Sequence, residues 1–296
     1  MPAPTALPAC PDCGHTPATA LGALPDVAFF AGRRLVAPLP GGRLLRCAAC
    51  DLRWRWPLVT GFEQLYDNSA VDAWTMGPMR QDQQLVHDIV VSRGQARNVL
   101  DFGCYSGEFL ARLPARLQRY GVEVSAAAAA LAHERAGATV KATLAQQAAD
   151  LRFDVVVAMD VIEHVPSPRA LLGELLERLA PGGLLIITTG DGANALWRMV
   201  GPRWWYCYFP EHIAFISRRW LEVHVPAAGA KLLDVQTFNY LQQPGAAKRW
   251  WGWLKYLVRP AHQARKRVRH LQETGRDLGV PGGGLVRDHL LVQVAR

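Results

Sequence analysis

The stretch from residue 98 to residue 113 constrains the fold of this chain most strongly. An apolar run ends in Asp101, a turn rich in small residues follows through Gly103 and Gly107, and a helical pattern begins at Glu108. This order predicts a strand, a tight loop and a helix. Because glycine tolerates unusual backbone φ and carries no side chain, such a loop lets a ligand approach the backbone closely. A single glycine-rich turn does not identify the ligand, so the flanking chain has to do so.

The segments after the glycine loop repeat this alternation of strand and helix. A short strand is predicted at 120–125, and Ser125 is expected to cap the alanine-rich helix behind it. Buried strands are predicted at 153–160 and 184–189, with a helix at 168–179 between them. Alternation at this spacing predicts parallel βαβ units with right-handed crossovers.

Glu123 lies in the short strand, about twenty residues beyond Asp101. An acidic residue at this place in a doubly wound sheet accepts hydrogen bonds from the ribose hydroxyls of a nucleoside, whereas an ordinary surface acid is the alternative. A dinucleotide site needs the longer Gly-x-Gly-x-x-Gly spacing around its pyrophosphate. The turn between Gly103 and Gly107 lacks this spacing, which argues against NAD(P).

Four motifs in order now carry a family resemblance. They are Val-Leu-Asp-Phe-Gly-Cys-Tyr-Ser-Gly at 99–107, Gly-Val-Glu-Val-Ser at 121–125, Phe-Asp-Val-Val-Val-Ala-Met-Asp-Val-Ile-Glu-His at 153–164 and Leu-Ala-Pro-Gly-Gly-Leu-Leu-Ile-Ile at 179–187. Over about 96–240 the chain resembles the class I methyltransferases that depend on S-adenosylmethionine (SAM). The resemblance implies a Rossmann-like, doubly wound α/β sheet of seven strands, the last of them antiparallel.

The resemblance also implies the residues that hold SAM. The glycine loop would bind the methionine part, Glu123 the ribose, and the segment from Asp160 to Glu163 would line the methyl-donor pocket. One departure is Tyr105, which occupies the place of the family's middle glycine and would either crowd the cofactor or pack over it. The expected cofactor-binding residues are Asp101, Gly103, Tyr105, Gly107, Glu123, Asp160 and Val161.

Two Cys-x-x-Cys pairs mark a separate N-terminal module. Cys10 and Cys13 form the first pair, and Cys47 and Cys50 form the second. In a chain without a recognisable secretion signal, this paired spacing favours a metal over disulfides, and four thiolates fill a closed tetrahedral Zn²⁺ site. We therefore predict a structural zinc ion in a zinc-ribbon-like module, with redox-active or free thiols as the alternative.

A Glu-His pair after the last buried strand is the candidate catalytic site. Glu211 and His212 lie in a connection at 190–218 that is rich in aromatic residues and is expected outside the carboxyl ends of the strands, where ligands bind. Such a pair is suited to removing a proton as methyl transfer proceeds. The zinc module and this pair together are similar to sugar C-methyltransferases acting on nucleotide-linked keto-sugars, which implies proton transfer by His212 and Glu211. His164 is a second candidate.

The net charge of +8 is concentrated in one segment. Nine basic residues and one acidic residue, Glu273, lie between Lys248 and Arg276, interleaved with tryptophans and leucines. Three interpretations stay open for this segment: a helix packed as a lid or dimer contact, an interfacial helix on an anionic membrane, or a nucleic-acid contact.

These observations predict a zinc-ribbon-like module at 1–60, a helical linker or cap at 61–95 with a helix around 79–91, and a methyltransferase domain at 96–296 with a basic insertion at 241–285. The predicted function is SAM-dependent O- or C-methylation of a small molecule, a nucleotide- or lipid-linked sugar being the favoured acceptor. An RNA methyltransferase or RNA-binding module is the alternative. The proline-rich N-terminus shows no secretion signal, so we expect a cytoplasmic protein, with contact to the inner membrane face left open.

Overall fold

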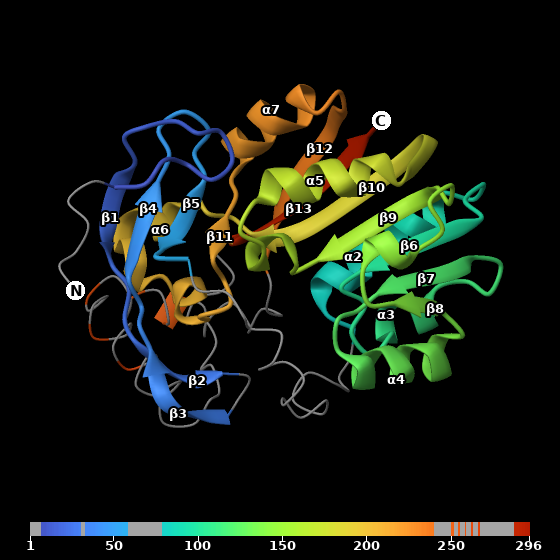
Figure 1. Ribbon diagram of the computed structural model, residues 1–296, viewed down its shortest axis with the longest axis horizontal. Helices are drawn as coiled ribbons and strands as arrows, with labels where there is room; N and C mark the ends of the chain where they lie inside the picture. Colours follow the sequence, from blue (N-terminus) through green and yellow to red (C-terminus); the bar gives the residue numbers. More distant parts are fainter. Residues whose placement is uncertain are drawn as a thin grey trace.

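The computed structural model describes residues 7–30, 33–58, 79–239 and 287–296, together with positions 250, 251, 254, 258, 262 and 266. Within these residues, seven strands form one sheet in the order β12-β13-β10-β9-β6-β7-β8 (Figure 1). β13 runs antiparallel to both of its neighbours, and the other neighbouring strands are parallel. The predicted sheet, including its antiparallel last strand, is confirmed. Its strands are β6 (Asn98–Phe102), β7 (Gln118–Val122), β8 (Thr139–Lys141), β9 (Phe153–Met159), β10 (Leu179–Gly190), β12 (Lys231–Phe238) and β13 (His289–Ala295).

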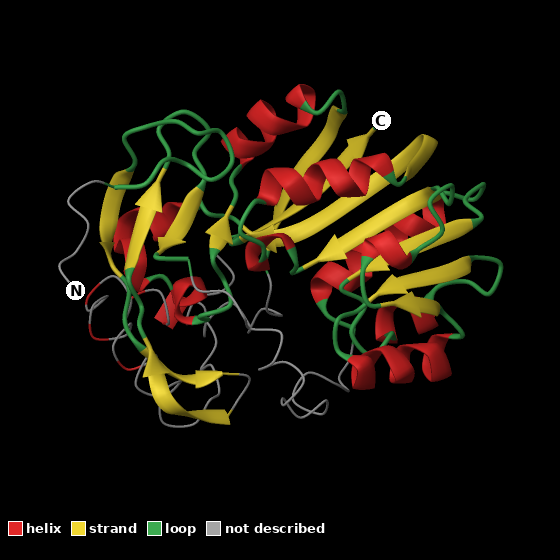
Figure 2. Ribbon diagram, in the orientation of Figure 1, coloured by secondary structure: helices red, strands yellow, loops and turns green. Residues whose placement is uncertain are grey.

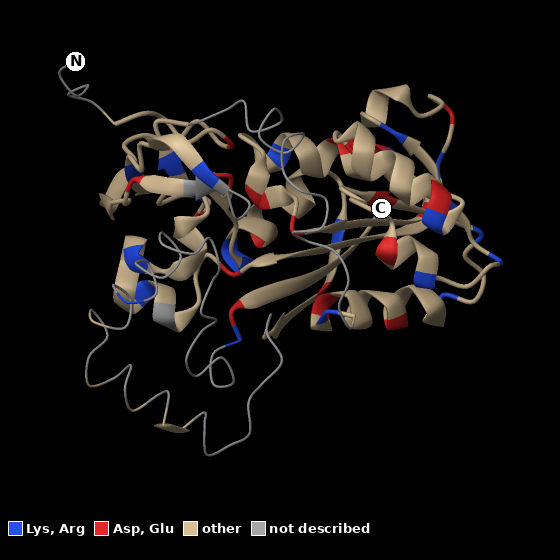
Figure 3. Cartoon of the chain, turned by 90° about the horizontal axis from the view of Figure 1, so that it is seen from below, with Lys and Arg blue, Asp and Glu red and all other residues tan. Residues whose placement is uncertain are grey.

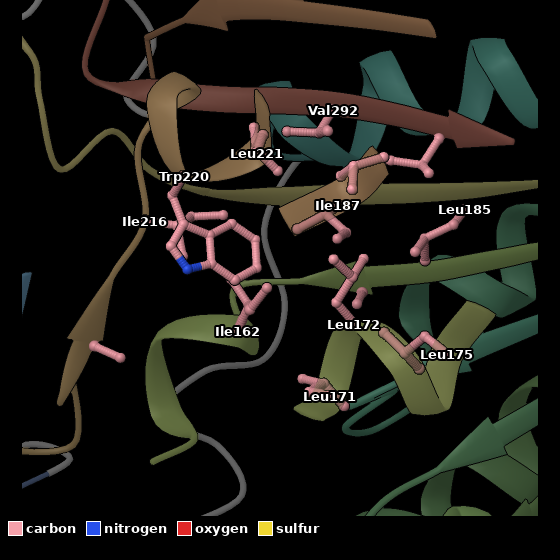
Figure 4. Packing of buried hydrophobic residues seen from close by; sticks show 14 of the residues in the cluster. Ile162, Leu171, Leu172, Leu175, Leu185, Ile187, Ile216, Trp220, Leu221 and Val292 are labelled. Carbon is pink, nitrogen blue, oxygen red and sulfur yellow. The ribbon is translucent and has the colours of Figure 1, made fainter. Parts of the chain in front are cut away.

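Helices cover both faces of this sheet (Figure 2). The side chains of β9 alternate between two hydrophobic clusters: Val155 and Val157 pack with α2, α3 and α4, whereas Val156 and Ala158 pack with α5 and α7. Figure 4 shows Trp220 of α7 and Leu172 of α5 among the buried residues of the second cluster. The helices are α2 (Gln81–Ser92), α3 (Glu108–Arg112), α4 (Ala126–Ala136), α5 (Pro168–Glu177), α6 (Ala195–Val200) and α7 (Arg218–Ala227), with short 3₁₀ helices η2 (Leu144–Gln146), η3 (Ile162–His164), η4 (Gly201–Arg203) and η5 (Trp205–Tyr208).

Serine caps fix where three of these helices begin. Ser125, Ser167 and Ser217 each accept a hydrogen bond from a backbone N–H in the first turn of α4, α5 and α7, respectively. A serine cap satisfies one of the backbone donors that a helix leaves unpaired at its start and contributes about 1 kcal/mol. The cap predicted at Ser125 is therefore confirmed.

The N-terminal module is a small antiparallel sheet that extends into the methyltransferase-like part of the chain. The sheet order is β1-β4-β5-β11, and β2 and β3 form a separate hairpin. β11 comes from the connection after β10, and its two residues pair with β5 through Ala214 opposite Trp54 and Phe215 opposite Arg53. The strands are β1 (Thr19–Ala23), β2 (Val27–Phe30), β3 (Arg33–Leu39), β4 (Arg43–Arg46), β5 (Arg53–Trp56) and β11 (Ala214–Phe215).

Each cysteine turn of the module also contacts a helix of the larger sheet. Asp12 lies between the first two cysteines and accepts hydrogen bonds from Ser167 Oγ at 2.9 Å and Trp220 Nε1 at 2.7 Å. Asp51 follows the last cysteine and accepts one from Ser217 Oγ at 2.8 Å. The serines that cap α5 and α7 thus also bind the two cysteine turns, which joins the module to the sheet at two buried polar points.

The aromatic connection after β10 packs against the N-terminal module. Most of its rings are buried in a cluster with module residues such as Leu24 and Leu44. The reason is that the module packs over this connection and excludes water from it. The buried rings are those of Trp197, Trp204, Trp205, Tyr206 and Tyr208.

The basic insertion lies mostly outside the described residues. Its described positions include four exposed apolar side chains, those of Trp250, Trp251, Leu254 and Val258. No helix found among the described residues has both the length and the apolar character needed to cross a bilayer. Figure 3 shows basic and acidic residues interspersed along the described part of the chain. The described part therefore does not share the concentrated basic charge that the sequence has between Lys248 and Arg276.

Candidate active site

The glycine loop after β6 is packed tightly against two neighbouring segments. Gly103 has φ +82°, and a Cβ there would come within 2.6 Å of Val161 Cγ2. Gly107 has φ +74°, and its Cβ would come within 2.8 Å of both Cα and Cβ of Ala132 on α4. Both glycines are required by positive φ and by close approach, and the contact with Val161 brings the predicted donor-pocket segment against the loop.

Tyr105 adopts the left-handed conformation that the family's glycine would favour. Its φ is +46°, which costs a residue with a Cβ about 1–2 kcal/mol. Its backbone N–H donates to Glu123 Oε2 at 3.0 Å, and Ser125 N–H donates to Glu123 Oε1 at 2.8 Å. Glu123, which lies just after the end of β7 rather than within the predicted strand, therefore ties the two loops together.

Two buried carboxylates flank the loop at the ends of β6 and β9. Burial raises the pKa of Asp101 to about 7, and burial raises that of Asp160 to about 6 although Arg80 lies beside it. Arg80 Nη2 lies 2.9 Å from Asp160 Oδ2, but the Oδ1 atoms of both aspartates are buried without a hydrogen-bond partner among the described residues. Two unpartnered carboxylate oxygens fit a ligand that brings positive charge and hydrogen-bond donors. Sequence reasoning missed Arg80, because nothing local ties it to Asp160.

A second cluster joins Glu163, Tyr206, His212 and His164 beside these carboxylates. Glu163 accepts hydrogen bonds from Tyr206 Oη and from Thr189 Oγ1, the latter at 2.9 Å. The ring of His212 lies with its centroid 4.1 Å from that of Tyr206 and 4.9 Å from that of His164. A carboxylate oxygen of Glu163 and one ring nitrogen each of His164 and His212 lie within 4.8 Å of one another. One bound group could therefore contact all three side chains.

Both histidines of this cluster are held neutral. Burial lowers the pKa of His164 to about 4, and burial together with the neighbouring His164 lowers the pKa of His212 well below its usual range. His212 Nδ1 lies 3.0 Å from the carbonyl oxygen of Tyr206. The neutral ring must therefore carry its proton on Nδ1 and donate it to that carbonyl, which leaves Nε2 as the proton acceptor.

Glu211 does not share a hydrogen bond with its neighbour His212 among the interactions found. Its side chain is buried, its Oε2 has no hydrogen-bond partner in the part of the chain that the structure describes, and burial raises its pKa to about 7. The structure thus associates His212 with Tyr206 and His164 instead of with Glu211. His164, the second candidate of the sequence, lies directly at the cluster.

The four cysteines of the module converge on one point. Cys10 and Cys50 have Sγ atoms 3.7 Å apart, and those of Cys13 and Cys47 are 3.5 Å apart. A tetrahedral site with Zn–S bonds of about 2.3 Å has sulfur–sulfur edges of about 3.8 Å, so the geometry fits one zinc ion. All four Sγ atoms lie within 4.8 Å of one another, and three of the four cysteines are buried.

The close packing of Gly107 leads to a stability prediction. Gly107→Ala is expected to lower the free energy of unfolding by about 2–4 kcal/mol, because the strained φ and the clash with Ala132 add together. Gly137→Ala is the matched control, since Gly137 also has positive φ but no heavy atom within 4 Å of its Cβ position. It should cost only about 1–2 kcal/mol. Urea unfolding of both variants measures the difference, and equal losses would show that α4 does not press on the loop.

Comparison with known proteins agrees with this geometry. The family model described as a methyltransferase domain matches residues 79–235, more than half of the chain. A ubiquinone biosynthesis O-methyltransferase of Cereibacter sphaeroides is 39% identical over 127 residues, which cover 38% of this chain and 50% of the relative. One of Parvibaculum lavamentivorans is 31% identical over 156 residues, covering 48% of this chain and 61% of the relative. The chain thus spans about half to three fifths of the length of these relatives.

Solved structures share the fold at low sequence identity. The crystal structure of the cyclase SpnF has a TM-score of 0.51 at 19% identity and covers 79% of this chain and 95% of its own. A complex of the Haloferax volcanii Trm112 methyltransferase activator with a methyltransferase has a TM-score of 0.51 at 15% identity, covering 80% and 98%. These likenesses concern the fold alone, whereas the match of the family model identifies the family. This chain belongs to the methyltransferase-domain family.

Proposed function

We propose that the chain is a SAM-dependent O-methyltransferase that methylates a hydroxyl group of a small molecule. One observation carries the proposal. At the carboxyl edge of one sheet, a cofactor-type loop lies together with two buried carboxylates that each have an unpartnered oxygen and with a pair of neutral histidines. Family membership supports the reaction class, and relatives named as O-methyltransferases support oxygen as the acceptor atom.

The residues divide into a donor side and an acceptor side. On the donor side, Asp101 and Asp160 would bind the positively charged part of SAM, and Glu123 would accept hydrogen bonds from its ribose. SAM supplies the methyl electrophile when bound. On the acceptor side, the free Nε2 of His212 would take the hydroxyl proton as the oxygen is methylated. Holding the acceptor in line for transfer contributes several kcal/mol more to lowering the barrier.

The finer acceptor class predicted from the sequence stays a proposal. The proposal of a nucleotide- or lipid-linked sugar as acceptor is based on the zinc module and the Glu-His pair. The relatives do not support a sugar. Contact of the basic insertion with an anionic membrane is likewise a proposal, supported by the exposed Trp250, Trp251, Leu254 and Val258. The nucleic-acid alternative gains no support from the described residues, whose charges are mixed (Figure 3).

Calorimetry with SAM and with S-adenosylhomocysteine (SAH) tests the proposal, followed by transfer of a labelled methyl group to hydroxylated aromatic compounds and nucleotide sugars. Glu123→Ala should weaken SAH binding about tenfold or more, through the loss of ribose and loop hydrogen bonds. His212→Ala should leave SAH affinity within about twofold and lower turnover about 10²–10⁴-fold, the usual contribution of a general base.

His133→Ala is the control, since His133 is an exposed histidine on α4 whose ring contacts the carbonyl oxygen of Ala138. The His133→Ala variant should change neither the SAH affinity nor the turnover rate. Failure of the wild-type protein to bind both SAM and SAH would reject the function. A His212→Ala variant that loses SAH binding but keeps its turnover rate would reject the division of roles.

A further inference from the structure

The N-terminal module reaches the acceptor side of the site through β5. The backbone N–H of Arg55 donates to the carbonyl oxygen of Ile213 at 2.8 Å, next to the point where β11 pairs with this strand. Ile213 N–H in turn donates to the carbonyl oxygen of Glu163 at 2.8 Å. The residue that follows His212 is therefore held between the module on one side and the buried Glu163 on the other.

The side chain of Arg55 makes a second and more direct connection. Its Nη1 donates to the carbonyl oxygen of Gly41 at 2.8 Å, within the module. Its Nη2 donates to the carbonyl oxygens of Cys207 at 2.8 Å and Phe209 at 3.3 Å, both in the segment that precedes His212. Arg55 is 1% exposed, so water does not compete for these bonds.

These bonds fall on the atoms that orient His212. The Phe209 carbonyl that Arg55 contacts also accepts the backbone N–H of His212 at 3.1 Å. The Cys207 carbonyl belongs to the residue after Tyr206, whose own carbonyl receives the His212 ring at 3.0 Å. A shift of this segment would therefore move both the backbone and the ring contact of His212.

Burial of this guanidinium group needs a reason, since its side-chain hydrogen bonds to described residues all go to carbonyl oxygens and only the nearby carboxyl of Glu211 offsets its charge. Removing an arginine charge from water costs several kcal/mol, and an apolar side chain of similar size would fill the same space without that cost. The planar fork of arginine, however, holds several acceptors in one fixed arrangement, which neither an apolar chain nor the single ammonium of lysine reproduces. The cost is understandable if the arrangement of the segment at 207–213 matters for function.

We infer that Arg55 is a positioning residue for methyl transfer, through which the N-terminal module sets the geometry of the segment that carries His212. This inference rests on the proposed role of His212. It gives the module a task in the reaction although the module lies outside the residues matched by the family model.

Arg55→Met, which keeps the size and removes the donors, tests the inference in the zinc-loaded protein saturated with SAH. Hydrogen exchange of the amides of Cys207, His212 and Ile213 should accelerate about tenfold or more. SAH affinity and zinc content should stay within about twofold, while kcat for the acceptor found above should fall about 10–100-fold with the KM for SAM unchanged. Arg55→Lys should recover part of the lost kcat, because the ammonium group still donates hydrogen bonds, although from a single nitrogen.

Arg53→Met is the matched control, since Arg53 is buried in the same strand but its side chain bonds Asp51 within the module. It should leave exchange at the three amides unchanged. The inference is overturned if Arg55→Met keeps wild-type exchange and kcat, or if Arg53→Met changes both equally. If Arg55→Met does not fold, Arg55→Lys decides alone, and wild-type exchange and kcat in that variant overturn the inference. Absence of SAH binding in the wild type would reject the proposed function. Hydrogen exchange would still show separately whether Arg55 holds the segment at 207–213 in place.

Discussion

Replacing Cys47 or Cys50 by serine is expected to release zinc and to unfold the N-terminal module locally. The sulfur–sulfur distances of 3.5 and 3.7 Å fit a tetrahedral site, and structural zinc sites contribute on the order of 10 kcal/mol to the folding of small domains. That contribution is as large as the whole stability of a typical domain, so the small sheet β1-β4-β5-β11 should not survive its loss. Atomic emission for zinc and hydrogen exchange by mass spectrometry measure both effects.

The loss should extend beyond the module itself. β11 is paired only with β5 in its sheet, and Asp12 and Asp51 of the cysteine turns bind the serines that cap α5 and α7. Amides of Ala214 and Phe215 should therefore exchange faster in the zinc-free protein, whereas those of β9 should not change. Cys104→Ser serves as control, because Cys104 is buried outside the cluster and its loss should leave zinc bound. Full zinc content in the Cys47 variant, or zinc-free wild-type protein of unchanged stability, would contradict a structural metal site.

The parts of this fold that the sequence predicts correctly are those written into local patterns. The Gly103–Gly107 turn, the apolar run of β9 and the serine before α4 each act over a few residues, and all appear where expected. The seven strands and the antiparallel direction of the last one followed from the resemblance, whereas the order of the strands is a finding of the structure. Even the unusual Tyr105 has a local explanation, because its φ of +46° replaces a glycine conformation.

What the sequence does not predict are contacts between distant segments. β11 has only two residues, too few for any periodic pattern, and it becomes a strand only because β5 offers free backbone groups beside it. His164 and His212 are 48 positions apart, and only the folded sheet brings their rings to 4.9 Å. Burial of the aromatic connection has the same origin. Tryptophans near a predicted ligand edge look like acceptor contacts until the module is seen to cover them.

Asp101→Asn is expected to stabilise the ligand-free protein at pH 8 while weakening its binding of SAH. Burial raises the pKa of Asp101 from 3.8 to about 7, so the folded state binds more protons than the unfolded state between these two values. Stability therefore falls as the pH rises through this window, and the cost of the buried charge is complete above pH 7. Asparagine carries no charge at any pH, and removing the penalty should raise stability by on the order of 1–4 kcal/mol at pH 8.

Thermal unfolding from pH 4.5 to 8.5 checks the sign. The Tm of the variant should exceed that of the wild type most above pH 7, and the difference should shrink as the pH falls towards 4. Taking the difference at each pH removes the contributions of His164, His212 and the other titrating groups that both proteins share. Asp150→Asn, at an exposed position, serves as the control substitution. A Tm difference that does not depend on pH would contradict the raised pKa of Asp101.

At saturating SAH the order of the two Tm values should then be reversed, with the wild type more stable than the variant. A ligand that binds only the folded state stabilises it by about 2.7 kcal/mol at a hundred times its Kd, and the wild type gains this in full. The variant has lost a carboxylate whose unpartnered oxygen fits the ligand, so its gain should be smaller. Greater stability without ligand and less with it would show that Asp101 is kept buried and charged for the cofactor at the expense of the empty fold. A variant that binds SAH as tightly as the wild type would instead place the cofactor elsewhere on the sheet.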